Sequence, residues 1–270
     1  IDVPELYGGL QLDIATSMLA GTKFSAVPSF AATFGAHTSI GTLPIVYFGT
    51  EQQKKKYLPR MVKGELISSY ALTEPTSGSD ALAAKCRADL SPDKKSYMLN
   101  GTKAWITNAG FADLFIVFAQ VDGNKFTGFI VEKNYPGVTT GAEEHKMGLH
   151  GSSTRIVNLD NVPVPVENVL GEIGKGHKIA FNCLNIGRFK LGSACIGGCE
   201  HIIDESVKFA KERHQFGVPI ASFGAIKHKI GQMAMLAWVG ESMVFRTAGL
   251  IDAALAGVDR LNNDDVIKAI

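Results

Sequence analysis

The spacing of apolar residues divides the chain into three segments, and the first has a helical pattern. Up to about residue 66, apolar residues recur at the three- and four-residue intervals of an α-helix. Tyr57, Leu58 and Met61 fall on one side of such a helix, opposite a lysine run at residues 54–56 that we expect to face solvent. The pattern predicts an N-terminal helical domain over residues 1–66.

From residue 67 the pattern changes to short β-prone runs separated by turn residues. Asn100 and Gly101 stand between two such runs, and Asp122 and Gly123 stand between the next two. Both pairs suit the two-residue turns of β-hairpins, in which the backbone takes positive φ. Several short strands with turn signals between them predict a compact antiparallel β domain, a sandwich or a barrel, over residues 67–170.

After Gly176 the helical period returns in two long apolar stripes, one of which runs from Ile226 to Leu255. Long helices that carry such stripes usually pack as a bundle. We therefore expect the methionine and phenylalanine side chains along them, and Trp238, to lie in a core. Residues 264–270 have the pattern of the first turn of a further helix, and both ends of the chain look cut.

The fold class expected from these segments is α+β with several domains. N-terminal helices (1–66, partial) precede a central antiparallel β domain (67–170) and a C-terminal helical bundle (171–270, incomplete).

Composition narrows the classes of partner. The chain has 270 residues, 46% of them hydrophobic and 20% charged, which are ordinary values for a globular protein. Lys and Arg total 27 against 26 for Asp and Glu, so no nucleic-acid or membrane-surface patch is indicated. No apolar run reaches the length of a membrane span, and no signal-peptide pattern is present, so we do not expect secretion.

The cysteines and histidines favour a reducing compartment and no metal site. The four cysteines form no C-x-x-C pair, and the seven histidines have no metal-ligand spacing. We expect reduced, buried thiols. No Gly-x-Ser-x-Gly motif is present either, so nucleophilic acyl hydrolysis has no support.

Two stretches carry candidate chemistry: YALTEPTSGSD at residues 70–80 and WITN at residues 105–108. Each places polar groups at a strand end beside an aromatic ring. A flat electron-accepting heterocycle such as a flavin needs an aromatic face and fixed donors near its ring nitrogens and oxygens. The alternatives are a surface turn and a core tryptophan. Glu74 is expected to hold backbone N–H groups and Asp80 to cap a helix or turn, rather than to act as an acid and base pair.

Four stretches in order resemble the signatures of the acyl-CoA dehydrogenases: YALTEPTSGSD, LNGTKAWITNAG, ENVLGEIGKG and ERHQFGVPI. The resemblance covers essentially the whole chain and is nearest to the long-chain and very-long-chain subgroup. It implies N-terminal helices, a middle β domain and a C-terminal four-helix bundle, with FAD between the β domain and the bundle.

Carried over by position, the resemblance implies a set of FAD contacts. Thr73 and Thr107 would bind the flavin edge, Trp105 would cover one face, and Ser79 would meet the pyrophosphate or the thioester. The full set is Tyr70, Leu72, Thr73, Gly78, Ser79, Trp105, Ile106, Thr107, Arg213 and Phe216. Of these, Arg213 and Phe216 would reach the FAD of a neighbouring subunit.

Substrate contacts are also implied, at Ser79, Asn185 and Arg188. Simpler roles remain open, because Arg213 could complement a helix dipole and Arg188 could be a surface arginine.

The family reaction is α,β-dehydrogenation of an acyl-CoA, in which a glutamate removes the α-proton. In most members this glutamate would lie beyond Ile270, and in others at the position of Gly187, so no catalytic residue is assigned here. Small residues at Gly35 and Ala36 favour a long acyl chain and a place in β-oxidation, although ordinary helix packing explains them nearly as well.

The resemblance further implies a homodimer or homotetramer and an electron-transfer flavoprotein as acceptor. The compartment would be the cytoplasm in a bacterium or the mitochondrial matrix in a eukaryote. Two other functions remain open: a non-catalytic assembly protein on the same fold, and a flavin oxidase or monooxygenase.

Overall fold

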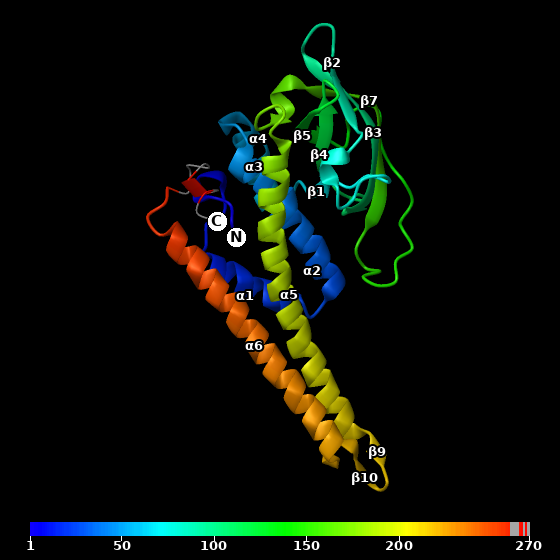
Figure 1. Cartoon of the computed structure of the whole chain (residues 1–270), viewed down its shortest axis with the longest axis vertical. Coiled ribbons are helices and arrows are strands. Elements are labelled where there is room, and N and C mark those ends of the chain that lie inside the picture. Colours follow the sequence, from blue (N-terminus) through cyan, green and yellow to red (C-terminus); the bar gives the residue numbers. More distant parts are fainter. Residues whose placement is uncertain (260–264, 267, 269–270) are drawn as a thin grey trace.

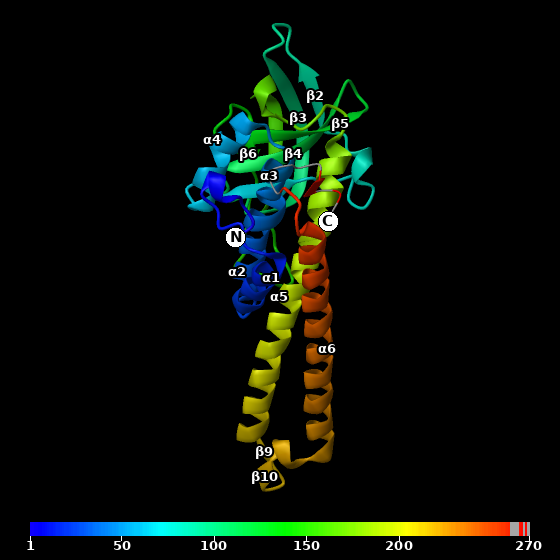
Figure 2. The same ribbon diagram turned by 90° about the vertical axis from the view of Figure 1, so that its left-hand side faces the viewer.

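The computed structural model describes residues 1–259, 265, 266 and 268. A β domain occupies one end of the molecule, and one long helix runs from it to a small hairpin at the opposite end, from which a second long helix returns (Figure 1). Short N-terminal helices pack beside the β domain, the first half of one long helix (α5, Gly176–Glu212) and the last half of the other (α6, Gly224–Leu255) (Figure 2). The helical turn predicted at residues 264–270 falls largely outside the described residues.

The N-terminal part is helical, as predicted. Its elements are η1 (Glu5–Tyr7), α1 (Ile14–Phe24), α2 (Pro28–Gly35), the π-helical turn η2 (Ala36–Gly41), α3 (Leu43–Phe48) and α4 (Glu51–Val62). Thr50 and Gln53 form a capping box that satisfies free N–H groups at the start of α4.

The predicted faces of α4 are correct with one exception. Tyr57, Leu58 and Met61 are buried, but Lys54 of the lysine run is buried as well. Because Lys54 lies four residues before Leu58, it shares the inward face of the helix. Only Lys55 and Lys56 are exposed, so the expectation of a solvated run is wrong for its first member.

The β domain is a single eight-stranded sheet with the order β6-β7-β3-β2-β4-β5-β8 and β1 paired to β4. The strands are β1 (Ser68–Ala71), β2 (Arg87–Leu90), β3 (Ser96–Thr107), β4 (Leu114–Val121), β5 (Lys125–Glu132), β6 (Val138–Thr140), β7 (Thr154–Pro165) and β8 (Val169–Leu170). Most pairings are antiparallel, but β1 and β2 both run parallel to β4. The expectation of a wholly antiparallel sheet is therefore corrected: β1 and β2 occupy one edge of β4 in succession.

One of the two predicted hairpin turns exists. Asp122 (φ 49°) and Gly123 (φ 81°) lie in the hairpin that joins β4 to β5, but the connection has three residues, with Asn124, rather than the two predicted. Asn100 and Gly101 do not form a turn, because β3 continues through them. Gly101 instead takes φ 151° at an irregularity in the pairing with β7. A Cβ atom on Gly101 would lie 2.9 Å from the Cys86 side chain, so glycine is needed there for close packing.

Strand β4 separates two hydrophobic cores. Its side chains alternate, so that Ile116 and Phe118 pack toward the helices, while Phe115 and Val117 pack against β3, β5 and β7. A strand buried on both faces is uniformly apolar rather than alternating, which agrees with the sequence of β4.

The C-terminal part consists of α5 (Gly176–Glu212) and α6 (Gly224–Leu255), joined by β9 (His214–Gln215), β10 (Val218–Pro219) and η5 (Ile220–Ser222). The start of α5 packs on the sheet, and its later part lies along α6 and α1. Among the described residues, no helix is long and apolar enough to cross a lipid bilayer.

Two expectations about these helices are wrong. Trp238 is 68% exposed, and Met235, Met243 and Phe209 are also exposed. The described residues place no layer over the outer faces of α5 and α6, so the apolar stripes are only partly covered. Of the cysteines, Cys86 and Cys183 are buried as expected, whereas Cys195 and Cys199 on α5 are exposed.

Candidate functional site

The stretch at residues 72–86 leaves the sheet between β1 and β2. Both strands pair with the same edge of β4, so this segment forms a loop that projects beside β3. The carbonyl oxygen of Thr73 accepts a 2.9 Å hydrogen bond from Ala104 N–H, and Glu74 and Ser77 exchange backbone hydrogen bonds of 2.9 and 3.1 Å. These contacts place the polar loop against the end of β3.

Glu74 anchors this loop from inside. Its carboxylate accepts hydrogen bonds from Lys85 N–H (2.7 Å), Cys86 N–H (3.0 Å) and the Lys103 ammonium (2.7 Å). The expectation that Glu74 holds backbone N–H groups is confirmed. The expected capping by Asp80 is wrong, because its side chain makes no cap to the following turn η3 (Ala81–Ala83).

Trp105 lies on a β-bulge. The pairing of β3 with β7 shifts between Lys103 and Ile106, and Trp105 takes φ 60°. A bulge re-aims the side chain that it carries. The indole is 60% exposed while Ala104 and Ile106 on either side are buried, so the core-tryptophan alternative is excluded.

Thr107 lies beside the end of β1. The Ser69 hydroxyl donates a 2.7 Å hydrogen bond to the Thr107 carbonyl oxygen, which joins the two strands at this point. Thr73 and Thr107 are half-buried, so each side chain retains access to the surface. The Thr73 backbone thus bonds to the residue before Trp105, and Thr107 follows Trp105 by two residues at the end of β3.

Tyr70, Leu72 and Ile106 have buried side chains, so their backbones are the parts closest to this surface. The Tyr70 hydroxyl donates to the Ala180 carbonyl oxygen of α5 over 3.2 Å. Burial raises the pKa of Tyr70 well above its ordinary value, and the charge of Arg188 partly opposes the increase. Tyr70 is therefore a neutral hydrogen-bond donor that joins the sheet to α5.

The predicted substrate contacts on α5 lie in this same region. The Arg188 guanidinium donates a 3.0 Å hydrogen bond to the Asn185 side chain, and both residues are exposed. Gly78 and Ser79 are exposed at the tip of the loop, and a Cβ on Gly78 would meet no atom within 4 Å. The loop tip and this part of α5 thus both present polar groups to solvent.

Arg213 and Phe216 lie elsewhere. They belong to the hairpin at the far end of α5, roughly 50 Å from Ala180 at 1.5 Å per helical residue (Figure 1). Phe216 is 94% exposed and takes φ 53°. Within one chain the structure does not bring these two residues to Trp105. Their predicted role on a neighbouring subunit stays a prediction.

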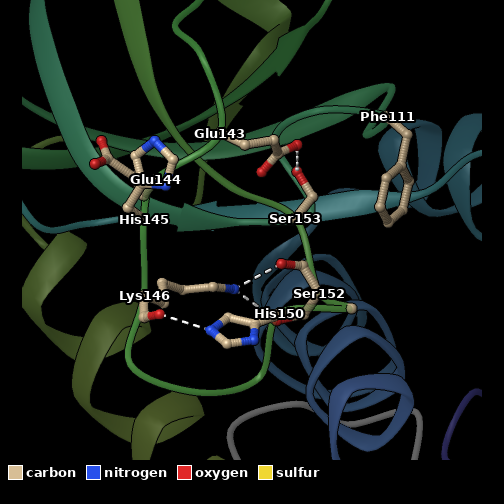
Figure 3. A pocket seen from close by; sticks show the side chains of 9 residues that line it. Phe111, Glu143, Glu144, His145, Lys146, His150, Ser152 and Ser153 are labelled. Carbon is tan, nitrogen blue, oxygen red and sulfur yellow. Dashed lines mark hydrogen bonds between the residues drawn. The ribbon is translucent and has the colours of Figure 1, made fainter.

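A cavity of about 500 Å³ lies beside the site, where the β6–β7 connection meets the start of β7 (Figure 3). Its polar groups bind one another. The Lys146 ammonium donates to the Ser152 carbonyl (2.6 Å), the Ser152 hydroxyl (2.9 Å) and the Thr154 hydroxyl (2.9 Å). Lys146 is not among the site residues predicted from the sequence. The cavity contains none of the predicted cofactor contacts, and its lysine is fully engaged.

Gly187 lies on α5 opposite η2. A Cβ on it would approach Ile40 Cγ2 to 2.9 Å and the Ser39 hydroxyl to 3.6 Å. The position therefore has no room for a larger side chain. Since the Glu74 carboxylate is fully paired, neither residue offers a free proton acceptor at the site.

The surface around Trp105 fits a planar, electron-accepting ring. It combines an exposed aromatic face with threonine hydroxyls at two strand ends, and the exposed Arg188 of α5 can attract an anionic part of a ligand. Fixed donors of this kind stabilise negative charge that develops on a bound ring better than mobile water does.

Comparison with known protein families finds matches to three successive domains of one family. A model of the acyl-CoA dehydrogenase N-terminal domain matches residues 1–65, the middle-domain model matches residues 69–162, and the C-terminal-domain model matches residues 174–263.

Individual relatives are closely similar over part of their length. A probable acyl-CoA dehydrogenase of Bacillus subtilis (strain 168) is 57% identical over 251 residues, which are 93% of this chain and 42% of the relative. The mitochondrial very long-chain specific acyl-CoA dehydrogenase of Bos taurus is 47% identical over 227 residues, 81% of this chain and 35% of the relative.

A solved structure shares the fold closely. The crystal structure of an acyl-CoA dehydrogenase from Bacillus anthracis, complexed with FAD, matches with a TM-score of 0.98 and 51% identity, covering 99% of this chain and 47% of that one. The chain thus spans less than half the length of these three relatives. With all three domain models matched in order along it, the chain belongs to the acyl-CoA dehydrogenase family.

Proposed function

We propose that the full-length protein is an FAD-dependent acyl-CoA dehydrogenase that introduces the α,β double bond into a long-chain acyl-CoA during fatty-acid β-oxidation. The observation that carries this proposal is the exposed indole of Trp105, held on a strand bulge beside Thr73 and Thr107. Membership of the family supports the reaction class, and the FAD in the Bacillus anthracis relative supports the cofactor.

The chain's own residues would hold and orient the cofactor. Trp105 covers one face of the flavin, and the polar groups of Thr73 and Thr107 meet its edge. When bound, the flavin supplies the acceptor for the hydride that leaves the β-carbon. Leu72 and Ile106 contribute through their backbones because their side chains are buried. Tyr70 would hold α5 beside the cofactor site through its hydrogen bond to the Ala180 carbonyl oxygen.

Other residues would hold the phosphate-containing parts of the ligands. Gly78 and Ser79 lie at the exposed loop tip, which suits the FAD pyrophosphate or the substrate thioester. Asn185 and Arg188 would contact acyl-CoA from α5. A guanidinium pairs bidentately with phosphate, which also suits Arg213 to the FAD of a neighbouring subunit beside Phe216. The assembly would then be a homodimer or a homotetramer.

The proposal also covers the acyl chain length, the catalytic base and the electron acceptor. The small residues Gly35 and Ala36 on the N-terminal helices, and the very-long-chain name of the Bos taurus relative, favour a long acyl chain. We assign no proton acceptor in this chain and expect the catalytic glutamate beyond Ile270. The proposed electron acceptor is an electron-transfer flavoprotein, in the cytoplasm of a bacterium or the mitochondrial matrix of a eukaryote.

The test uses the purified full-length protein. It should bind FAD, appear yellow, and lose its flavin absorbance anaerobically when palmitoyl-CoA is added, with butyryl-CoA much less effective. A protein that cannot be loaded with FAD would contradict the proposal. Binding of FAD without bleaching by any acyl-CoA would favour a non-catalytic assembly role. Rapid reoxidation of the reduced protein by oxygen would favour an oxidase or monooxygenase.

A further inference from the structure

A buried ion pair lies beneath the candidate flavin site. The Lys103 ammonium is 2.7 Å from a Glu74 carboxylate oxygen, and the two side chains are 0% and 4% exposed. Lys103 also donates to the Leu72 carbonyl oxygen over 3.1 Å. Since Glu74 accepts from Lys85 N–H and Cys86 N–H, the pair holds the loop at both the point where it leaves the sheet and the point where it returns.

The pair stands directly behind the groups that would contact the flavin. Glu74 follows Thr73 in the loop, and Lys103 precedes the bulge that carries Trp105 by two residues. Among the described residues, no other ion pair joins this loop to β3. The neighbouring pair Arg87–Asp89 is 3.1 Å long but lies on the surface, with both side chains more than 60% exposed.

The surroundings of the pair have low polarity. Burial raises the pKa of the adjacent Cys86 thiol to about 11, with Lys103 lowering it and Glu74 raising it. Removing two charges from water costs several kcal/mol, and an apolar pair of the same size would often be at least as stable. Stability alone is therefore a weak reason to bury a lysine and a glutamate at this point.

We propose that Glu74 and Lys103 are positioning residues: together they set the distance between the polar loop and the Trp105 bulge, and they keep the charge behind the flavin neutral. This inference depends on the proposed function. A bound ring gains negative charge when it is reduced, and unpaired charges in a low-dielectric interior act over several ångströms. A lone ammonium would therefore favour reduction, and a lone carboxylate would oppose it.

The experiment compares four variants of the full-length protein: Glu74→Gln, Lys103→Met, the double variant Glu74→Gln/Lys103→Met, and the matched control Asp89→Asn on the surface of β2. Two quantities are measured for each: the Kd for FAD of the apoprotein and the midpoint potential of the bound flavin. Neither quantity depends on turnover.

Opposite shifts in potential are expected from the single variants. Glu74→Gln should raise the midpoint potential and Lys103→Met should lower it, while the double variant returns close to the wild-type value. The double variant should bind FAD roughly tenfold more weakly, because the loop loses the charged hydrogen bonds that hold it against β3. Asp89→Asn should change neither quantity.

Shifts of the same sign in the two single variants, or wild-type FAD affinity in the double variant, would overturn the inference. If the single variants do not fold, the Kd of the double variant for FAD decides whether the inference holds. The double variant should still fold, because it buries no unpaired charge. If the wild-type protein takes up no FAD, the proposed function fails, and this inference fails with it. If the wild type binds FAD normally and the variants have the same Kd and midpoint potential, the positioning role is wrong but the proposed function stands.

Discussion

The backbone N–H of Ala104 donates a 2.9 Å hydrogen bond to the Thr73 carbonyl oxygen, which joins the loop after β1 to the bulge in β3. This backbone hydrogen bond joins the two halves of the candidate site on the surface side, and the buried Glu74–Lys103 pair joins them from inside. Trp105 follows Ala104, and its indole is 60% exposed. Its position is fixed by its neighbours and its surface remains available to a ligand.

The first prediction is that the exposed Trp105 side chain contributes to FAD binding but little to stability. Replacing Trp105 with alanine should change the free energy of unfolding of the apoprotein by less than about 1 kcal/mol, because surface residues contribute little to stability. FAD affinity should fall roughly tenfold if Trp105 is the stacking partner that we propose, and Trp105→Phe should retain most of the affinity. Urea denaturation and FAD titration measure the two effects. A loss of stability with unchanged FAD affinity would contradict the prediction.

The second prediction concerns Gly101. A side chain there would meet Cys86 at 2.9 Å, and the residue takes φ 151°. Gly101→Ala should cost about 2 kcal/mol or more, from backbone strain and the clash together. Gly123→Ala is the matched control, because Gly123 also has positive φ (81°) but no atom within 4 Å of the added methyl group. It should cost only about 1 kcal/mol. Equal costs in denaturant unfolding would show that the contact with Cys86 is unimportant.

Gly101 also shows where local sequence information was insufficient. The pair Asn100-Gly101 has the composition of a hairpin turn, as does Asp122-Gly123, yet only the second pair forms one. The strand continues through Asn100 and Gly101 because it pairs there with β2 and β7, and the glycine is needed because Cys86 lies against it. Such a requirement comes from a neighbouring strand, so the sequence around Gly101 does not contain it.

The order of helices, sheet and helices was predictable because the apolar period changes clearly at residues 67 and 176. The loop with Thr73 and the exposed Trp105 were found as candidate groups, since both carry unusual polar and aromatic residues at strand ends. Lys103 was missed: a lysine in a strand is normally expected to face solvent, and only the position of Glu74 explains its burial. The exposure of Trp238 depends on which layers cover α6, and a stripe on one helix does not give that information.

A third prediction concerns pH and His37. Its Nδ1 accepts from Ser68 N–H at 3.1 Å, and its Nε2 lies 3.2 Å from the Met61 carbonyl oxygen. Burial lowers its pKa from the ordinary value of 6.5, and the hydrogen bond to Met61 opposes part of that effect. The unfolded state therefore binds the proton more tightly than the folded state.

The stabilisation from neutral His37 should be fully present above pH 6.5 and should decrease as the pH falls from there through the lower folded-state pKa. Unfolding free energies of the wild type and His37→Gln, measured between pH 7.5 and 5, isolate this contribution because the other titrating groups are common to both. The wild type should lose more stability than the variant over this range. If the two curves of unfolding free energy against pH are parallel, His37 has the same pKa in the folded and unfolded states.

A fourth prediction concerns Asp252, in the last turn of α6. A carboxylate there opposes the dipole of its own helix. However, its two oxygens accept from Ile14 N–H (2.8 Å) and Ala15 N–H (3.0 Å) at the start of α1. Asp252→Ala should cost about 2 kcal/mol, since it leaves two N–H groups of the first turn of α1 without their acceptor, although the N-cap Asp13 of that helix remains. The matched control Asp204→Ala, at an exposed position of α5, should be nearly neutral. Thermal or urea unfolding gives both values, and a neutral Asp252→Ala would contradict the capping role.

The last prediction concerns Gly187, where α5 passes η2. Alanine normally stabilises a helix relative to glycine by about 1 kcal/mol. At Gly187, however, the new methyl group would meet Ile40 Cγ2 at 2.9 Å, and this branch lies too close to the backbone to move freely. Gly198 on the same helix has nothing within 4 Å of an added methyl group. Gly198→Ala should therefore stabilise the protein, while Gly187→Ala should be neutral or destabilising.

Gly187→Glu extends the same argument to function. Its longer side chain must enter the space held by Ile40 and Ser39, or push α5 away from η2. Overpacking of this kind typically costs 1–3 kcal/mol. The displacement of α5 should also weaken binding of a long-chain acyl-CoA, because Asn185 and Arg188 move with the helix. If Gly187→Glu keeps wild-type stability and acyl-CoA affinity, the contact between α5 and η2 is looser than the structure indicates, and this position could accommodate a carboxylate base.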